Sequence, residues 1–546
     1  MDSKSVICSP LVQSLLRSHP NEITHPHPLW LSTGWWQWSK DQSRWRSLLE
    51  VYNGSSSNEL DDIPSEIIDL IHSLRQTELD RKPIIMSSVS PSMDTKRMSP
   101  KKAHEVRRMV DYLDSLLRPS NTPSAETYKP RFVDVGAGQG YLSRALAAHF
   151  DTDVLALDAD CVQTSGAQRT VDSRITHRTL LVDPSSLRSA IDEWLSQLPK
   201  IPADNVPVVL VALHACGSLS PDILRAFLSL HAADKRRQSR WNISAVAVVG
   251  CCYNLLRPED CPLSQAYSSC FPNVDALPPA AYHLATQTPS HWLDTRKSSA
   301  SAELSIKKVV WRAALAHLPS IKSDLCSRGS PDSKNTVDYP IPVIPARPAH
   351  QTPRSPDSPE NPLGEVDPGV KAPLPFSRIG NGTIAAPRNK SGKSSRDIDS
   401  STGDGGIGSV LPLRRLGRLP DSAYADWSTF LLRAGQKIGM ELSSSSSGRS
   451  PADSAATDET HPTATQLETL HVLRCLLGPA IESLILRDRL CWVKECLGAS
   501  TSSVSPTPSV EEQREPVSVS LVNIFDQGCE SARNVAIVVA PQPTNS

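Results

Sequence analysis

Apolar runs and amphipathic segments alternate through the middle of the chain. Five short runs of β-branched, aliphatic and aromatic residues have the length and composition of buried strands. They lie at residues 132–135, 154–157, 178–182, 206–213 and 243–249. Between the runs, apolar residues recur every three or four positions, which is typical of amphipathic helices. This alternation predicts a doubly wound α/β fold, with a parallel sheet covered by helices on both faces.

The pattern changes on both sides of this predicted core, to which we assign residues 96–319. Residues 1–95 hold five of the eleven tryptophans and predict short helices that form an N-terminal cap. Residues 320–420 are rich in proline and serine and predict a disordered linker, because such a composition cannot bury enough apolar surface to offset the lost chain entropy. Residues 421–500 return to helical periodicity and predict a helical insertion.

Two final apolar runs, at residues 517–525 and 534–540, predict an antiparallel β-hairpin. Both runs are largely apolar on two faces, as the interior strands of a helix-covered sheet are. Two strands are too few to stand alone as a separate β domain, so we expect the hairpin at residues 517–540 to complete the sheet. The prediction is therefore a Rossmann-like sheet of seven strands, with the linker and the helical insertion placed before its last two strands.

The composition indicates the partners and the cellular compartment to expect for this fold. A net charge of −1 gives no bulk electrostatic reason to bind nucleic acid or a membrane. Twelve cysteines without a Cys-x-x-Cys pair favour free thiols in a reducing compartment. The first residues lack a basic start followed by a long apolar core, and no apolar run approaches the roughly 20 residues that span a bilayer. We therefore expect a soluble protein of the cytoplasm or the nucleus.

A glycine-rich turn follows the first predicted strand, where residues 134–140 read DVGAGQG. Glycine lets the backbone pass close to a ligand, and the helix that follows presents free N–H groups. The dinucleotide motif Gly-x-Gly-x-x-Gly needs its third glycine where this chain has Tyr141, so the turn departs from NAD and FAD sites. A purely structural turn is the other alternative. With its acid, the turn resembles motif I of class I S-adenosylmethionine (SAM) methyltransferases.

The resemblance to motif I implies contacts with SAM, because in that family the loop wraps the amino-acid part of the cofactor and the acid helps to hold its ammonium group. The residues of this turn that we expect to contact SAM are Asp134, Gly136, Gly138 and Gly140. Asp158 follows the second strand 22 residues after Gly136, close to the spacing of about 20 residues at which an acid meets ribose hydroxyls. Asp183 ends the third predicted strand and is expected near the adenine.

Polar residues gather at the ends of the fourth and fifth predicted strands, and the carboxyl ends of parallel strands are where ligands bind. His214 follows the fourth strand. Because methyl transfer to an oxygen atom benefits from a base, His214 is a candidate catalytic residue, with a core histidine bonded to the backbone as the alternative. Tyr253 follows the fifth strand and is the second catalytic candidate, expected to orient the acceptor or to stack on it.

Three cysteines accompany these residues. Cys216 lies two positions after His214, and Cys251 and Cys252 precede Tyr253, so neighbouring strands would bring several metal-ligand side chains together. The set could bind zinc, but close ligand pairs of the Cys-x-x-Cys type are missing. A cysteine nucleophile, as in carbon-5 methylation of pyrimidines, is a further alternative. We expect small buried residues at the strand ends and no metal.

Six stretches of the chain read MSPKKAHEVRR, VDVGAGQGYLSR, LHACGSLS, GCCYN, LLGPAIESLILRDRL and SARNVAIVV. Together they resemble the methyltransferase-like protein 25 family, some of whose members are labelled ribosomal RNA adenine dimethylase domain-containing proteins. The resemblance runs from about residue 30 to residue 540, interrupted by the linker. It implies a SAM-dependent methyltransferase and supports the hairpin as the closing strands of the sheet.

The residues after the fourth strand indicate the acceptor. Adenine dimethylases place Asn-(Leu/Ile)-Pro-(Tyr/Phe) there to clamp a flipped adenine, whereas this chain has LHACG. His-x-Cys-Gly followed by Cys-Cys after the next strand is similar to a family of tRNA ribose 2′-O-methyltransferases, which implies RNA as the acceptor. A SAM-fold scaffold without catalysis and a methyltransferase of proteins or small molecules are the alternatives.

A basic stretch at the start of the helix predicted from Pro100 is the candidate contact with RNA, with a solvated helix face as the alternative. No membrane partner is expected. The basic residues of this stretch are Lys101, Lys102, Arg107 and Arg108.

Overall fold

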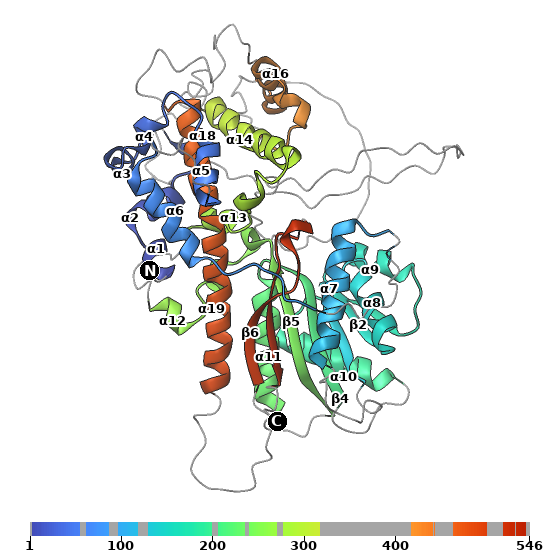
Figure 1. The fold of residues 1–546 in the computed structure, drawn as a ribbon. Helices are drawn as coiled ribbons and strands as arrows, with labels where there is room; N and C mark the ends of the chain where they lie inside the picture. The colour runs from blue at the N-terminus through green and yellow to red at the C-terminus, as the bar shows by residue number, and fades with distance from the viewer. Residues whose placement is uncertain are drawn as a thin grey trace, which may run out of the picture.

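The computed structural model describes residues 3–23, 25–54, 62–86, 95, 97–117, 129–198, 206–234, 240–269, 277–316, 416–440, 442, 462–499, 517–529 and 531–541. The predicted linker lies outside these residues except for its last five positions, and so do residues 443–461 of the predicted helical insertion. The described segments form a sheet with helices on both faces and a group of helices beside it (Figure 1).

Seven strands form one sheet in the order β3-β2-β1-β4-β5-β7-β6. β1 to β5 are parallel, and β7 runs antiparallel to both β5 and β6. The strand order and the place of β7 confirm the predicted Rossmann-like α/β fold of class I methyltransferases. The strands are β1 (Arg131–Val135), β2 (Val154–Asp158), β3 (Ile175–Thr179), β4 (Val206–Cys216), β5 (Trp241–Cys251), β6 (Val517–Asn523) and β7 (Val535–Pro541).

The pairing corrects two expectations about strands. The third strand lies at Ile175–Thr179 and not at residues 178–182, because these five residues pair in register with β2 whereas Leu181 is 77% exposed in the following loop. β3 is a half-buried edge strand and therefore does not need an apolar composition. β6 is also a half-buried edge strand, so the burial expected for both hairpin strands holds for β7 alone.

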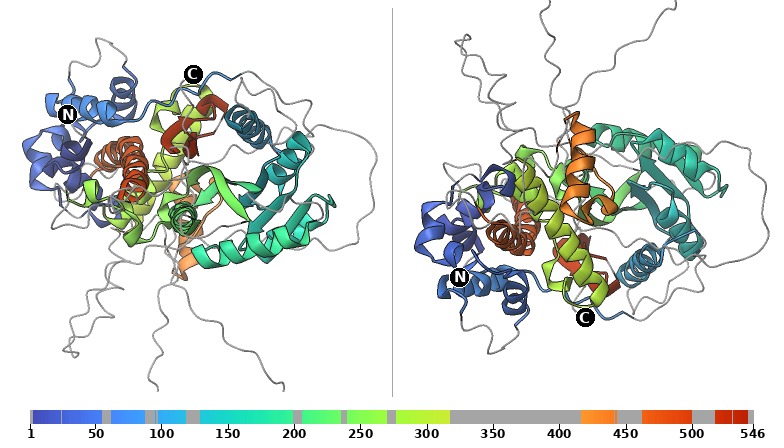
Figure 2. Two further views of the ribbon diagram at one scale, coloured as in Figure 1. Left: turned by 90° about the horizontal axis from the view of Figure 1, so that it is seen from below. Right: turned by 90° about the horizontal axis from the view of Figure 1, so that it is seen from above.

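Helices close in sequence to the parallel strands cover both faces of the sheet (Figure 2). α7 and α8 pack on one face, against residues such as Phe132 and Val209. α10 and α11 pack on the other face, against residues such as Val133 and Leu210. Successive strand residues point to opposite faces, which explains why the central strands are apolar throughout. The helices are α7 (Pro100–Leu117), α8 (Tyr141–Phe150), α9 (Cys161–Gln168), α10 (Pro184–Gln197) and α11 (Leu219–Asp234).

A second group of helices packs beside the sheet around its own apolar core, and we call this group the helical half. Its core joins N-terminal tryptophans such as Trp30 and Trp35 to insertion leucines such as Leu470 and Leu473. The ring centroids of Trp30 and Trp35 are 5.4 Å apart. The helical half comprises α1 (Ser3–Ile7), α2 (Pro10–Arg17), α3 (Pro28–Ser32), α4 (Trp35–Trp38), α5 (Trp45–Tyr52), α6 (Ser65–Thr77), α12 (Gln265–Ser268), α13 (Pro279–Leu284), α14 (Arg296–Ala316), α18 (Ala464–Leu476) and α19 (Gly478–Ala499).

A smaller helix, α16 (Trp427–Ile438), packs on α14 through the rings of Trp311 and Phe430, whose centroids are 5.5 Å apart. Single turns of 3-10 helix connect several of the longer elements. They are η1 (Pro20–Glu22), η3 (Tyr253–Leu255), η4 (Pro258–Asp260), η5 (Pro289–His291), η6 (Asp421–Tyr424) and η8 (Gln527–Cys529).

The long helix α19 is shared by the sheet and the helical half (Figure 1). Ile481 and Ile485 belong to the core of the helical half, whereas Leu486 and Val493 belong to a core on the sheet. α18 and α19 together form a helix over Ala464–Gly498 with a mean hydropathy of 1.4 in its most apolar window. By length and composition this helix could cross a membrane, contrary to the sequence-based expectation, but its apolar window is entirely buried inside the protein. A buried core helix has the same pattern.

Candidate active site

The glycine turn of residues 134–140 joins β1 to α8. Gly136, Gly138 and Gly140 all adopt the left-handed backbone conformation, with φ angles of 76°, 54° and 68°. A side chain at these positions would strain the backbone, which explains the three glycines. An added Cβ at Gly138 would meet no atom within 4 Å, so the backbone of the turn is open to the approach of a ligand.

Asp158, at the end of β2, holds this turn in place. Its carboxylate accepts hydrogen bonds from the backbone N–H groups of Gly138 and Asp160, each at 2.8 Å. The carbonyl group just before Asp158 accepts two more bonds, from the N–H groups of Gly136 at 2.8 Å and Ala137 at 3.0 Å. Asp158 therefore lies beside the turn, and its contact with the ribose of SAM stays a prediction.

Asp134 is buried beneath the turn. It is 1% exposed, and its carboxylate accepts a hydrogen bond from the Ser143 hydroxyl at 2.6 Å. Burial raises the pKa of Asp134 to about 6, although the bond from Ser143 opposes this shift. The contact with the ammonium group of SAM stays a prediction.

Asp183 does not end a strand, because β3 stops at Thr179. Its carboxylate caps α10 and accepts hydrogen bonds from the N–H groups of Ser185 and Ser186 at 2.8 and 3.0 Å. The Ser185 hydroxyl and these capping bonds lower the pKa of Asp183 to about 2. The strand-end argument that placed Asp183 at the adenine is therefore wrong.

His214 lies within β4, which extends to Cys216 and not only to residue 213 as predicted. Its Nε2 atom is 3.2 Å from Oε2 of Glu105 on α7, and 38% of its side chain is exposed. Glu105 is buried, and its other carboxylate oxygen accepts a hydrogen bond from the Ser531 hydroxyl at 3.1 Å. Burial favours a higher pKa for Glu105, but the hydrogen bond and charge of His214 and the charge of Lys101 lower it overall.

Sequence reasoning missed Glu105 as a partner of His214. The signal was its position one turn before Met109, on the buried face of α7, because a buried acid needs a hydrogen-bonding partner. The carbonyl oxygen of His214 would lie 3.8 Å from a Cβ atom added to Gly136. The backbone of His214 is therefore next to the glycine turn, and Glu105 contacts its ring from α7.

Tyr253 is a core residue. It is 1% exposed, and its hydroxyl donates a hydrogen bond to Glu482 on α19 at 3.2 Å. The chain turns at Cys252 into η3, which directs the tyrosine ring inward. The structure therefore contradicts the predicted role of Tyr253 in orienting or stacking on an acceptor.

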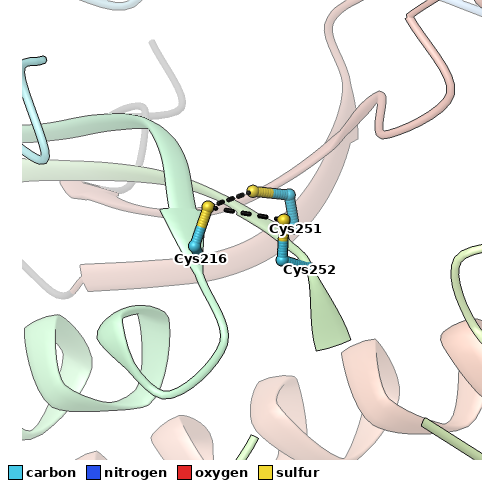
Figure 3. Close-up of side chains that lie close together, drawn as sticks. All are labelled: Cys216, Cys251 and Cys252. Atoms are coloured by element: carbon cyan, nitrogen blue, oxygen red, sulfur yellow. Dashed lines mark hydrogen bonds between the residues drawn. The ribbon is translucent and has the colours of Figure 1, made fainter. Parts of the chain in front are cut away.

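The three cysteines converge where β4 and β5 end (Figure 3). The Sγ atom of Cys216 is 3.1 Å from that of Cys251 and 3.5 Å from that of Cys252. Hydrogen bonds among the thiols lower the pKa of Cys252 and raise the pKa of Cys251. Among the described residues, the group of metal-ligand atoms found here consists of these three thiols and does not include His214.

The basic stretch at the start of α7 is partly used inside the protein. Arg108 donates hydrogen bonds to the carbonyl oxygens of Ile524 at 2.8 Å and Ile84 at 2.7 Å, so it ties α7 to two other segments. We therefore remove Arg108 from the candidate RNA contacts. The residues of the stretch that stay candidates are Lys101, Lys102 and Arg107.

Residues 101–259 match the model of a protein family described as a methyltransferase domain. The matched region contains β1 to β5, the glycine turn, Glu105, His214 and the three cysteines. The match and the strand order identify this part of the chain as a class I methyltransferase domain. Domains of this class take the methyl group that they transfer from SAM.

Among solved structures, the chain is similar to geranyl diphosphate C-methyltransferase from Streptomyces coelicolor A3(2), in complex with Mg2+, geranyl diphosphate and S-adenosyl-L-homocysteine. The two sequences are 11% identical, and the similarity covers 39% of this chain and 65% of that chain, with a TM-score of 0.16. The chain thus spans less than two thirds of that protein, and a likeness at this level carries no conclusion about acceptor or partners.

Proposed function

We propose that the chain is a SAM-dependent methyltransferase that methylates an oxygen atom of RNA. The observation that carries the proposal is the place of His214, partly exposed next to the glycine turn and held by the buried Glu105. The methyltransferase domain supports methyl transfer as the reaction. The resemblance to the methyltransferase-like protein 25 family and to tRNA ribose 2′-O-methyltransferases supports RNA as the acceptor.

The residues of the glycine turn fit SAM. When bound, SAM supplies an electrophilic methyl group for an in-line displacement. The left-handed backbone of Gly136, Gly138 and Gly140 allows a ligand to approach closely, and the start of α8 presents backbone N–H groups. Asp158 keeps the turn in this conformation through its bond from Gly138.

On the acceptor side, His214 acts as the base. Because Nε2 of His214 is bonded to the Glu105 carboxylate, Nδ1 is the ring atom that receives the proton of the acceptor hydroxyl. Glu105 is a positioning residue that fixes the tautomer and orientation of the ring. A base of this kind contributes a factor of about 10²–10⁴ to the rate.

The start of α7 offers the contact with RNA. Lys101 and Lys102 lie one turn before Glu105 on α7, and the Nζ atom of Lys101 is 3.9 Å from the Glu105 carboxylate, so a phosphate bound to them is close to His214. Arg107 lies on another face of the helix and would contact a more distant part of the RNA. Phosphate contacts of this kind position a nucleic acid without reading its sequence.

The proposal is tested with SAM labelled in its methyl group, incubated with total RNA and total protein from cells that lack this gene. We expect label in the RNA fraction that nuclease releases and protease does not, and a 2′-O-methylated nucleoside after digestion. Label in the protein fraction would indicate a protein methyltransferase. Binding of SAM without label in any fraction would indicate a scaffold.

Three variants separate the steps. Gly138→Val should raise the Kd of SAM at least tenfold by calorimetry, because it strains the turn and blocks close approach. His214→Ala should lower kcat about 100-fold and leave the Kd of SAM within twofold of wild type. Glu105→Gln should lower kcat about tenfold with little change in KM, as a positioning residue does.

The matched control is His72→Ala, which removes an exposed histidine of α6 and should leave kcat unchanged. Equal turnover of the His214 and His72 variants on the labelled RNA would show that His214 is a structural residue.

A further inference from the structure

We propose that Cys216, Cys251 and Cys252 bind a thiophilic metal ion, with zinc as the expected ion. The proposal reverses the sequence-based expectation of no metal, and it rests on how the two strand ends bring the thiols together. It does not depend on the proposed methyl transfer, because the site is defined by its three thiols alone.

The first two thiols meet through the register of the sheet. Cys216 ends β4 and Cys251 ends β5, and the two residues are direct partners in the parallel pairing. Partners on neighbouring parallel strands point to the same face of the sheet. The fold therefore places these two thiols side by side, with Sγ atoms 3.1 Å apart.

The third thiol meets them through an uncommon backbone conformation. In an extended strand, Cys252 would point to the opposite face from Cys251. Instead it has φ 48° and ψ 49°, in the left-handed region that a residue with a side chain rarely adopts. This turn brings its Sγ atom 3.5 Å from that of Cys216 (Figure 3). Strain of this kind is found at functional sites.

The two loops that carry the thiols are also locked to each other. The N–H group of Gly217 donates a hydrogen bond to the carbonyl oxygen of Cys251 at 2.9 Å. A Cβ atom at Gly217 would lie 2.6 Å from Leu255, so this position needs glycine for the loops to pack. The thiols are thus held by a rigid frame and do not depend on mobile side chains alone.

The number and type of the donors indicate the ion. A disulfide would use two of the thiols, whereas all three lie within 4.8 Å of one another. Zn–S bonds of about 2.3 Å in a tetrahedron place sulfur atoms roughly 3.8 Å apart, which a small opening of the cluster provides. Thiolates without carboxylate ligands favour zinc or copper(I) over magnesium or calcium. Each thiol releases its proton to solvent as its sulfur binds the ion.

The cluster has the ligand number of a catalytic zinc site. Structural zinc sites use four protein ligands, whereas catalytic sites use three and keep the fourth position for water or substrate. Cys216 is exposed, so an ion can reach the thiols from solvent. Arg533 lies close enough to Cys252 to favour its thiolate, and its charge would offset part of the excess negative charge of three thiolates on a divalent ion.

The test uses the full chain, reduced and freed of metal with a chelator, and titrated with Cd2+ alone. We expect one Cd2+ per chain, with the ultraviolet charge-transfer absorption of thiolate ligands. Cys252→Ser and Cys216→Ser should each weaken Cd2+ binding at least tenfold. The matched control is Cys161→Ser, which removes an exposed thiol at the start of α9 and should change nothing.

A second measurement on the wild-type chain covers the case in which a variant does not fold. One equivalent of Zn2+ should slow alkylation of Cys216 and Cys252 at least tenfold, read by peptide mass spectrometry, and leave Cys161 unchanged. Absence of stoichiometric binding, or equal binding by the Cys252 and Cys161 variants, would overturn the proposal. So would rapid formation of a Cys216–Cys251 disulfide by hydrogen peroxide in the presence of Zn2+, which would indicate a redox pair. SAM is left out throughout, so these outcomes do not depend on the proposed methyl transfer.

Discussion

The sheet half, which consists of the seven strands with α7 to α11, takes five of its seven strands from one stretch of the chain, whereas the helical half joins segments from both ends of the chain. β1 to β5 all lie within residues 131–251, and each parallel pair forms inside that stretch. In the helical half, Gln466 donates a hydrogen bond to the carbonyl oxygen of Trp36 at 2.9 Å, across 430 residues. Arg474 donates one to the carbonyl oxygen of Leu15 at 2.7 Å, across 459 residues. Local alternation is enough to outline β1 to β5, whereas the helical half, like the closing hairpin of the sheet, requires distant segments to meet.

The two halves are joined by buried polar contacts along α19. Glu482 accepts hydrogen bonds from Arg81, which follows α6, at 2.9 Å and from Arg533, which precedes β7, at 3.1 Å. It also accepts a hydrogen bond from the hydroxyl of Tyr253 at 3.2 Å. The two halves thus share α19, although they are built differently. Because α19 is buried against both, we infer that the halves unfold as one unit. The changes below test this inference, from the largest expected effect to the smallest.

A chain that ends at Pro516 lacks β6 and β7 and should lose the folded sheet half. β7 pairs with β5 and is buried on both faces, with Ile537 in one core and Val538 in the other. Its removal exposes the edge of β5 and much apolar surface. Far-UV circular dichroism should show no cooperative thermal transition, and calorimetry no SAM binding. A soluble truncated chain with full SAM affinity would show that the sheet closes without the hairpin.

Glu482→Gln should lower the free energy of unfolding by about 3 kcal/mol, because it leaves Arg81 and Arg533 without a carboxylate in a largely buried site. Chemical unfolding is followed by far-UV circular dichroism and by tryptophan fluorescence, and the two transitions should shift together. The control Glu259→Gln removes a charge from an exposed pair with Arg257 and should cost less than about 1 kcal/mol. Separate transitions in the Glu482 variant would contradict the single unit.

Asp134→Asn should stabilise the sheet half in a pH-dependent way. The folded-state pKa of about 6 lies above the unfolded value of about 3.9, so burial of this acid costs nothing well below pH 3.9, where it is protonated in both states, and costs less than about 1 kcal/mol at pH 4. As the pH rises from about 4 to about 6, wild type loses stability relative to the variant, and the difference levels off at about 3 kcal/mol by pH 7. Urea unfolding at pH 4 and pH 7 checks this. A difference between the two proteins that is the same at both pH values would count against the raised pKa.

Loss of function should accompany this gain in stability. If Asp134 holds the ammonium group of SAM, the Asn variant should bind SAM more weakly at pH 7 by calorimetry. A more stable variant with unchanged SAM affinity would assign Asp134 to the turn alone.

Deletion of residues 332–409 should leave the thermal stability of both halves unchanged. These residues belong to the predicted linker, and their composition cannot bury enough apolar surface to contribute to a core. The Tm, measured by differential scanning fluorimetry, should stay within about 3 °C of wild type. A fall of about 10 °C would show that this part of the chain packs on one of the halves.

The sequence by itself determined the features that depend on one residue or one short period. The left-handed φ of Gly138 is a property of a single backbone position, so the glycine pattern predicted the turn and its acid. The strands β1, β2, β4 and β5 followed from their apolar runs, because a strand buried on both faces needs them. The same rule failed at β3, because an edge strand tolerates polar residues and an apolar loop can follow it. The placement of Asp183 at the end of this strand failed for the same reason.

Only the tertiary structure decided which side chains meet. Glu105 and His214 come together because α7 packs across the end of β4, and no local pattern in either segment specifies that contact. Tyr253 has the sequence position of a site residue, yet α19 covers it and supplies Glu482 to its hydroxyl. Cys252 joins the other thiols through a backbone conformation that the surrounding loops impose on it. The physical reason is the same in each case: such contacts depend on the packing of whole elements, and many apolar residues stabilise that packing together.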